Sequence, residues 1–266
     1  MDDLDRLVQA VLKSPKYRSV SADVVRNIGA RELGVRPNWK EAVKATRNKL
    51  HQVGGVYFGV GVHYAQWLDE LKSAVATGNQ GELRRVCLRV MQYHSSTRER
   101  LPVLDQFYAV TLANLPPLRT VLDIACGLNP LAIPWMPLSK DAQYCAYDMY
   151  TDLMAFLGEF MSLVNPRGKA EACDVVQSPP ARQADLALIL KSLPCVEQLD
   201  KSASLRLLET LNANHLLVSF PVRSLGGRDK SMVQNYGAWF GELIAGKAWS
   251  VRRFEFATEL AFLVSK

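Results

Sequence analysis

The chain has 266 residues, of which 48% are hydrophobic and 22% are charged, a balance typical of a globular protein with ample core. No apolar run approaches the ~18 residues that a membrane span needs, and the start, Met1-Asp-Asp-Leu-Asp5, lacks the pattern of a signal peptide. The cysteines form no C-x-x-C pair and the histidines are dispersed, which argues against a disulfide framework or a metal cluster. We therefore expect a cytoplasmic protein with no membrane association and no metal. We also expect it to be a monomer.

The basic excess is concentrated near the start of the chain. The net charge is +6 and the pI is about 9.1. Residues 1–53 contain eleven Lys and Arg against six Asp and Glu, a difference of +5, so they carry nearly all of the excess. Solvated helix faces would account for such charges, but we favour RNA or another phosphate-rich partner for this region.

Hydrophobic periodicity predicts helices from residue 1 to about 113. Apolar residues recur at helical spacing from Leu4 to Leu12, and Ser14-Pro15 ends this first helix. Further helices are predicted over residues 22–33, 39–51, 64–76 and 81–93, with a sixth capped by Ser95 or Ser96. We expect residues 1–113 to form a helical region that precedes a second domain over 114–266.

In the second half, short apolar runs alternate with helical stretches, which predicts an α/β domain with a mostly parallel sheet. Strands are predicted over 120–124, 143–147, 170–173, 186–190, 216–220, 250–256 and 260–264, with helices near 149–164, 201–211 and 232–243. Only three residues separate the last two strands, so these must pair antiparallel. A parallel sheet closed by one antiparallel strand resembles the seven-stranded, Rossmann-like fold of S-adenosylmethionine-dependent methyltransferases.

A loop of small residues follows the first predicted strand. Ala125, Cys126 and Gly127 let a ligand approach the backbone closely, and ligands of open α/β sheets bind beyond the carboxyl ends of the strands. Asp148 and Lys191 end two of the other strands. Asp148 lies 21 residues after Gly127, the spacing at which an acid accepts hydrogen bonds from a ribose.

A third polar residue, Asp174, ends another strand, where a carboxylate or its neighbouring backbone can receive the exocyclic amine of an adenine. A single glycine followed by Leu128-Asn-Pro130 is a poor cradle for the pyrophosphate of a dinucleotide. S-adenosylmethionine has no phosphate, and needs an acid for its ribose and a cation for its carboxylate. These features favour S-adenosylmethionine as the cofactor, with Arg100 as the candidate cation.

Three segments of the chain carry recognisable motifs: Val121-Leu-Asp-Ile-Ala-Cys-Gly-Leu-Asn-Pro-Leu131, His94-Ser-Ser-Thr-Arg-Glu-Arg100 and Ser219-Phe-Pro-Val-Arg-Ser-Leu-Gly-Gly-Arg228. They resemble the motifs of one known family, the aminoglycoside-resistance 16S ribosomal RNA methyltransferases that modify N7 of guanine 1405. Shorter matches include Asn235-Tyr and Trp239-Phe. Near the N-terminus, Lys16-Tyr-Arg18, Val24-Val-Arg26 and Lys49-Leu-His51 also match. The resemblance spans essentially the whole chain.

The resemblance implies a role for each matched position. Arg100 would hold the methionine carboxylate and Asp148 the ribose. The other cofactor-binding positions would be Ala125, Gly127, Met149, Asp174, Val175 and Leu190. The helical N-terminal region would dock on the 30S subunit at its 16S rRNA decoding-site helix, and its candidate RNA-binding residues are Lys16, Arg18, Arg26 and His51.

The chemistry asks for positioning of the target base. N7 of guanine has a lone pair and no proton, so it needs no general base, and rate should come from alignment with the methyl group. N7 lies in the deep groove of A-form RNA, so we expect the guanine to be flipped out and clamped. The candidate clamp residues are Lys191, Arg223, Arg228, Tyr236 and Glu259, with Glu259 facing the donor edge of the guanine.

Three alternatives stay open. The chain could methylate adenine N1 at the same decoding site, or a small molecule, or bind the cofactor without activity. The basic helical region disfavours a small substrate, and the presence of Arg100, Asp148 and Asp174 disfavours an inactive binding protein.

Overall fold

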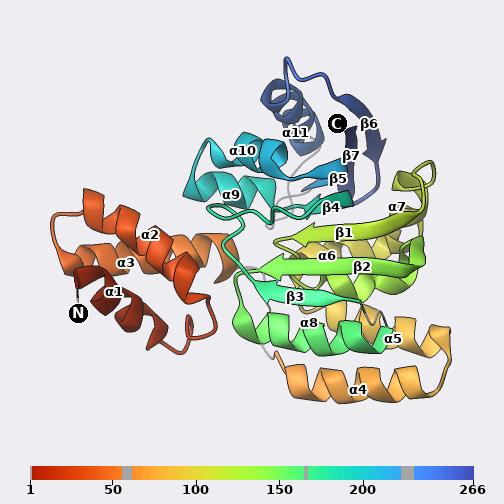
Figure 1. Ribbon diagram of the computed structural model, residues 1–266, viewed down its shortest axis with the longest axis horizontal. Coiled ribbons are helices and arrows are strands. Elements are labelled where there is room, and N and C mark those ends of the chain that lie inside the picture. Colours follow the sequence, from red (N-terminus) through yellow and green to blue (C-terminus); the bar gives the residue numbers. More distant parts are fainter. Residues whose placement is uncertain (1, 56–61, 165–166, 223–230) are drawn as a thin grey trace.

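The computed structural model describes residues 2–55, 62–164, 167–222 and 231–266. A seven-stranded sheet crosses the molecule in the order β3-β2-β1-β4-β5-β7-β6, and β7 runs antiparallel to β5 and β6 (Figure 1). The strands are β1 Leu118–Ile124, β2 Leu138–Asp148, β3 Lys169–Ala172, β4 Ala184–Leu190, β5 Ala213–Pro221, β6 Ser250–Glu255 and β7 Glu259–Ser265. All seven predicted strands are therefore confirmed, as is the antiparallel pairing of the last two.

Helices cover both faces of the sheet, which explains why β1 and β4 are apolar on both faces. One face packs against α4 Tyr64–Ala76, α5 Gln80–Met91, α7 Leu104–Thr111 and α8 Thr151–Val164. The other packs against α9 Leu193–Leu199, α10 Ala203–Thr210 and α11 Ser231–Leu243. Between α5 and α7 lie the short helices α6 Ser95–Arg100 and η2 Leu101–Val103, and η3 Asn129–Trp135 follows β1.

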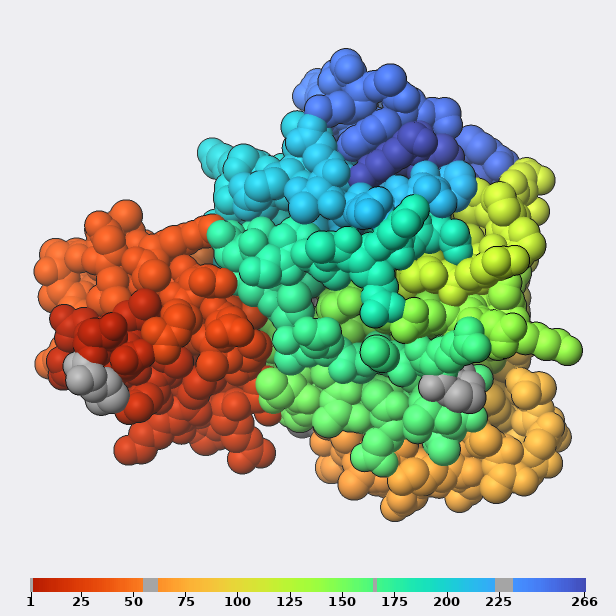
Figure 2. All heavy atoms as spheres, in the orientation of Figure 1, coloured from red at the N-terminus to blue at the C-terminus, as the bar shows by residue number. Residues whose placement is uncertain are grey.

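The first three helices form a unit with its own hydrophobic cluster. They are α1 Asp3–Leu12, α2 Ala22–Val35 and α3 Trp39–Leu50, followed by η1 His51–Gly55. Figure 2 shows this unit as a lobe that meets the rest of the molecule along one side. The backbone holds it there: Ser21 N–H donates to Met149 O (2.8 Å), and Thr151 N–H donates to Ser19 O (2.7 Å). The N-terminal unit, α1–η1, therefore lies against the carboxyl end of β2.

The structure differs from the predicted elements most clearly in three places. β2 begins at Leu138, five residues before the predicted start. α9 was not predicted. The helices expected in one region over residues 1–113 pack in two places, because α4, α5 and α7 join the core of the sheet while α1–α3 form a separate cluster. Among the described residues, no helix is long and apolar enough to cross a bilayer.

Candidate active site

The loop after β1 turns sharply beneath a histidine. Ala125 and Gly127 have φ values of 51° and 52°, in the left-handed region. A Cβ atom at Gly127 would lie 2.7 Å from the His94 ring, so no larger residue fits without displacing that ring. Cys126 N–H donates to Tyr147 O (3.0 Å), which fixes the loop against the end of β2. The small residues are thus required by the backbone path and by His94.

Asp148 joins the ends of β1 and β2. Its Oδ2 accepts Gly127 N–H (2.9 Å) and its Oδ1 accepts Met149 N–H (2.7 Å). Burial raises the pKa of Asp148, and the backbone N–H groups of Gly127, Met149 and Tyr150 oppose that rise. A carboxylate has about four lone-pair sites, so the group can still accept a hydrogen bond from a ligand hydroxyl. The predicted pairing of Asp148 with the glycine loop is therefore present.

Asp174 lies just beyond β3 and is buried. Its Oδ1 accepts the N–H groups of Val176 (3.0 Å) and Gln177 (3.1 Å), which form a turn around the carboxylate. Its Oδ2 accepts Nδ2–H of Asn27 (2.8 Å), a residue of α2. The sequence analysis did not single out Asn27, because nothing in the local pattern joins positions 147 residues apart.

Lys191 directly follows β4 and has a backbone conformation that favours glycine. Its φ is 60°, and among the described residues it shares this left-handed region with one other non-glycine residue, Ala125. Its Nζ donates to Ser96 O (3.2 Å) and to Glu99 Oε2 (3.0 Å). Strained backbone of this kind costs ~1–3 kcal/mol and gathers at functional sites.

These residues line one pocket at the carboxyl edge of the sheet. Its lining includes most of the predicted cofactor-binding positions: Ala125, Asp148, Met149, Asp174, Val175 and Leu190. Lys191, His94 and Ser96 also line it, as do Val196 and Leu199 of α9 and Val24 of α2. Two carboxylates with spare lone pairs, a small-residue loop and apolar walls fit the ribose, the methionine portion and the adenine of S-adenosylmethionine.

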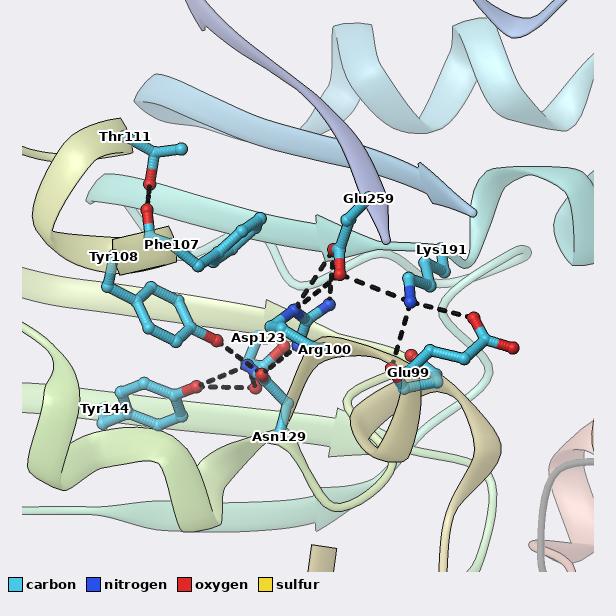
Figure 3. A network of polar contacts seen from close by, with 11 residues as sticks. Glu99, Arg100, Phe107, Tyr108, Thr111, Asp123, Asn129, Tyr144, Lys191 and Glu259 are labelled. Atoms are coloured by element: carbon cyan, nitrogen blue, oxygen red, sulfur yellow. Dashed lines mark hydrogen bonds and ion pairs between the residues drawn. The ribbon is translucent and has the colours of Figure 1, made fainter. Parts of the chain in front are cut away.

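Arg100 is not among the residues that line this pocket and lies instead in a buried polar network that reaches the pocket at Lys191 (Figure 3). Its guanidinium donates to both Glu259 oxygens through Nε (3.2 and 3.0 Å), to Oε1 again through Nη2 (2.7 Å), and to Asn129 Oδ1 through Nη1 (2.7 Å). Glu259 Oε2 lies 3.3 Å from Lys191 Nζ. Arg100 and Glu259 are fully buried. Burial would raise the pKa of Glu259, but Arg100 and Lys191 outweigh burial and lower it.

Asp123 and Asn129 extend the network into the core. Asp123 Oδ2 accepts the Tyr144 hydroxyl (2.6 Å) and Asn129 Nδ2–H (2.9 Å), and Asn129 Oδ1 also accepts the Tyr108 hydroxyl (2.6 Å). Burial raises the pKa of Asp123 to about 6, against the effect of these donors. The sequence analysis missed this pair, although an acid inside Val121-Leu-Asp-Ile124 and an asparagine five residues after the strand were signals.

The other clamp candidates differ in placement. Arg223 and Arg228 lie outside the described residues. The Tyr236 ring stacks on Phe220, with centroids 4.9 Å apart and planes at 19°. Glu259, expected to face the guanine, has no exposed surface and binds Arg100 and Lys191 instead. Within the described residues, Lys191 is the clamp candidate that lines the pocket.

The candidate RNA-binding residues lie on the N-terminal unit and are exposed. Lys16 Nζ is 3.1 Å from His51 Nδ1, so the fold brings these two together. Arg26 pairs with Asp5 (2.7 Å) on the surface of α2. Arg18 lies two residues from Lys16 in the connection between α1 and α2.

Comparisons with known proteins agree with this geometry. A 16S rRNA (guanine(1405)-N(7))-methyltransferase of Micromonospora rosea is 35% identical over 267 residues, covering 100% of this chain and 97% of that protein. The 16S rRNA (guanine(1405)-N(7))-methyltransferase of Serratia marcescens is 34% identical, covering 99% of both chains. The crystal structure of the 16S rRNA methyltransferase RmtF in complex with S-adenosyl-L-homocysteine superposes with a TM-score of 0.81 at 31% identity, covering 100% of this chain and 99% of that one.

The 16S rRNA methylase RmtB superposes with a TM-score of 0.79 at 30% identity, covering 99% of this chain and 98% of that one. Both likenesses extend over the whole chain, including the N-terminal unit, which a shared sheet alone would not explain. A model of the family described as ribosomal RNA methyltransferase (FmrO) matches residues 13–263. The chain therefore belongs to the FmrO family of ribosomal RNA methyltransferases, S-adenosylmethionine-dependent enzymes with the seven-stranded methyltransferase fold.

Proposed function

We propose that this chain transfers a methyl group from S-adenosylmethionine to N7 of guanine 1405 in 16S rRNA, within the 30S subunit, and so confers aminoglycoside resistance. The observation that carries the proposal is the pocket at the ends of β1, β2, β3 and β4, in a chain that matches rRNA methyltransferases over its full length. Ribosomal subunits are cytoplasmic, so we propose that the protein acts in the cytoplasm. We also propose that it acts as a monomer.

In this proposal the pocket residues divide the cofactor between them. Asp148 binds the ribose hydroxyls, and Asp174 with Val175 contacts the adenine. Ala125 and Gly127 line the methionine portion, and Met149 and Leu190 close the apolar walls. Arg100 has N–H groups beyond those given to Glu259 and Asn129, and these would bind the methionine carboxylate. Bound S-adenosylmethionine supplies an electrophilic methyl group.

The protein's contribution to rate is placement of the guanine. Because N7 attacks with its own lone pair, a correct approach angle and distance replace acid–base catalysis. Lys191 lies at the carboxyl end of β4, where Glu99, Ser96 and Glu259 fix the orientation of its side chain. It would contact the target base or its phosphate. Arg223, Arg228 and Tyr236 are the remaining clamp candidates. Glu259 would act by holding Arg100 and Lys191.

The N-terminal unit would bind the subunit through its basic surface. Lys16, Arg18, Arg26 and His51 are exposed there and would contact phosphates, which position a protein on RNA without reading sequence.

One assay tests the reaction. Labelled S-adenosylmethionine is incubated with the protein and intact 30S subunits, with naked 16S rRNA, or with neither. We expect label on intact subunits alone, and borohydride and aniline treatment should then cleave at the methylated guanine. Label without cleavage would indicate another atom, such as adenine N1. No label on any RNA would refute the proposal.

A second assay tests docking. Charge reversal at Lys16, Arg18 and Arg26 should weaken 30S binding and leave affinity for S-adenosyl-L-homocysteine unchanged. Lys140→Glu is the matched control, because Lys140 is an exposed lysine near the start of β2, at the opposite edge of the sheet. Equal 30S affinity for the triple variant and the control would contradict docking through α1–α3.

A further inference from the structure

The outer wall of the pocket comes from the N-terminal unit. Val24 of α2, which is 4% exposed, lines the pocket together with Val53 and Gly54 of η1. The lining also includes Asp174 and Val176, which follow β3, and Val196 of α9. The pocket is therefore closed on one side by helices that belong to a different hydrophobic cluster from the sheet.

Side-chain contacts hold α2 and α3 against two of the segments that form the pocket. Asn27 donates to Asp174, as described above. Arg31 Nη1 donates to Leu199 O (3.4 Å), and Lys49 Nζ donates to Gln198 O (2.7 Å), both at the end of α9. Leu199 itself lines the pocket. The N-terminal unit is thus fastened to Asp174, which we assign to the adenine, and to α9, which also lines the pocket.

We propose that Asn27 is a positioning residue of the methyl-donor site and that α2 forms the adenine end of that site. The proposal rests on the function proposed above. Backbone N–H groups hold Oδ1 of Asp174, and Asn27 holds Oδ2. A carboxylate oxygen has two lone pairs, so Oδ2 keeps one for the 6-amino group of adenine. Asn27 fixes the direction of that lone pair, and Val24 covers the ring.

The arrangement links the cofactor to RNA docking. The same helix carries Arg26, an exposed candidate for RNA contact, one residue before Asn27. A cofactor that binds best when α2 lies against Asp174 stabilises that position of the N-terminal unit. If 30S subunits bind the same position preferentially, subunit binding must increase the affinity for the cofactor. Such coupling is reciprocal by thermodynamic necessity.

The first test measures the affinity of the isolated protein for S-adenosyl-L-homocysteine by calorimetry. Asn27→Ala should weaken binding about tenfold, the size of one hydrogen bond to a charged group. Asn27→Asp, which sets a second carboxylate against Asp174, should weaken it further. The matched control is Asn48→Ala, the same change at an exposed position of α3, which should leave the affinity unchanged. Unchanged affinity in both Asn27 variants would overturn the proposal.

A second ligand separates positioning from a general structural role. S-inosyl-L-homocysteine carries an oxygen in place of the 6-amino group, so wild type should bind it more weakly than S-adenosyl-L-homocysteine. Asn27→Ala should reduce that preference, because the Asp174 carboxylate is no longer held in the orientation that accepts a hydrogen bond from the 6-amino group. An equal loss of affinity for both ligands would mean that Asn27 only supports the fold, and would refute the proposal.

The link to RNA is measured with 30S subunits. S-adenosyl-L-homocysteine should tighten subunit binding by wild type, and the gain should shrink in Asn27→Ala. An undiminished gain in Asn27→Ala would contradict the link. If wild type binds the cofactor but methylates no subunit, the proposed function fails, and the affinity tests on the isolated protein still decide the role of Asn27.

Discussion

Arg100 shows how one buried residue ties the site to the core. Arg98 and Arg100 lie in the last turn of α6, where the helix dipole favours positive charge. Arg100 is fully buried and pairs with Glu259, 159 residues away. Glu259 also lies 3.3 Å from Lys191 Nζ, so one carboxylate contacts both cations, and Lys191 has Glu99 as a second anionic partner.

Glu259→Gln should therefore be strongly destabilising. It keeps the shape of the side chain but leaves Arg100 without its anion, and breaking a buried pair in this way costs about 3–5 kcal/mol. The measurement is the free energy of unfolding in urea. Glu255→Gln is the control, because Glu255 pairs with Arg253 on the surface and is 59% exposed, so its loss should change stability by less than about 0.5 kcal/mol. Equal losses of unfolding free energy in the two variants would contradict a stabilising buried pair between Arg100 and Glu259.

His94 should make stability depend on pH. Burial, with Arg100, Lys191 and Arg98 nearby, lowers its pKa from 6.5 to about 3. The unfolded chain therefore binds a proton below pH 6.5 that the folded chain does not, so stability falls as the pH drops from 6.5 toward 3. At pH 5 the loss is about 2 kcal/mol, at 1.36 kcal/mol per pKa unit.

Replacement of His94 by Gln isolates that contribution. The difference in unfolding free energy between wild type and His94→Gln should shift by about 2 kcal/mol between pH 7 and pH 5, in favour of the variant. Asp123 acts in the opposite direction, because its raised pKa of about 6 makes the folded state the better proton acceptor between pH 3.8 and 6. It is present in both proteins and cancels in the difference. If the difference in unfolding free energy between wild type and His94→Gln were the same at pH 7 and pH 5, His94 would not be held neutral by the fold.

At the scale of elements, sequence pattern predicted the sheet well and the short helices poorly. The seven strands are apolar runs bounded by polar turns, and their ends placed Asp148, Asp174 and Lys191 on one edge correctly. α9 was missed because it is seven residues long and has Pro194 near its start, a position that helices tolerate but that reads as a break. Because α9 was not predicted, Val196 and Leu199 were not identified as residues that line the pocket.

The loop after β1 should be intolerant of a single added methyl group. Gly127→Ala puts a Cβ atom against the His94 ring at a φ of 52°, a conformation that costs an L residue about 1–2 kcal/mol. We expect lower stability and weaker binding of S-adenosyl-L-homocysteine, measured by thermal unfolding and calorimetry. Gly241→Ala, in α11 with open space around it, should stabilise the protein by about 0.5–1 kcal/mol. Unaltered cofactor affinity in Gly127→Ala would place the loop outside the pocket.

At the scale of the whole molecule, the pocket belongs to two packed units. Periodicity and strand ends identify positions that are close along one sheet, so the sequence predicted the carboxylates and the small-residue loop. It could not predict that Val24 and Asn27 close the same pocket, because that depends on how the N-terminal unit packs against the sheet. The same limit applies to Arg100 and Glu259, whose pairing requires both the sheet order and the position of α6.

Hydrogen exchange should show the two units responding together to the cofactor. A ligand that binds only the folded state stabilises it by about 2.7 kcal/mol at a hundredfold excess over its Kd, and slows exchange wherever the ligand closes the structure. S-adenosyl-L-homocysteine should protect the loops after β1 and β2, and also α2, although α2 belongs to a separate hydrophobic cluster. In Asn27→Ala, at a ligand concentration that restores saturation, protection of the loops should return while protection of α2 stays reduced, because the bond to Asp174 is missing. If α2 exchanges at the same rate with and without ligand in wild type, the helix does not form part of the site.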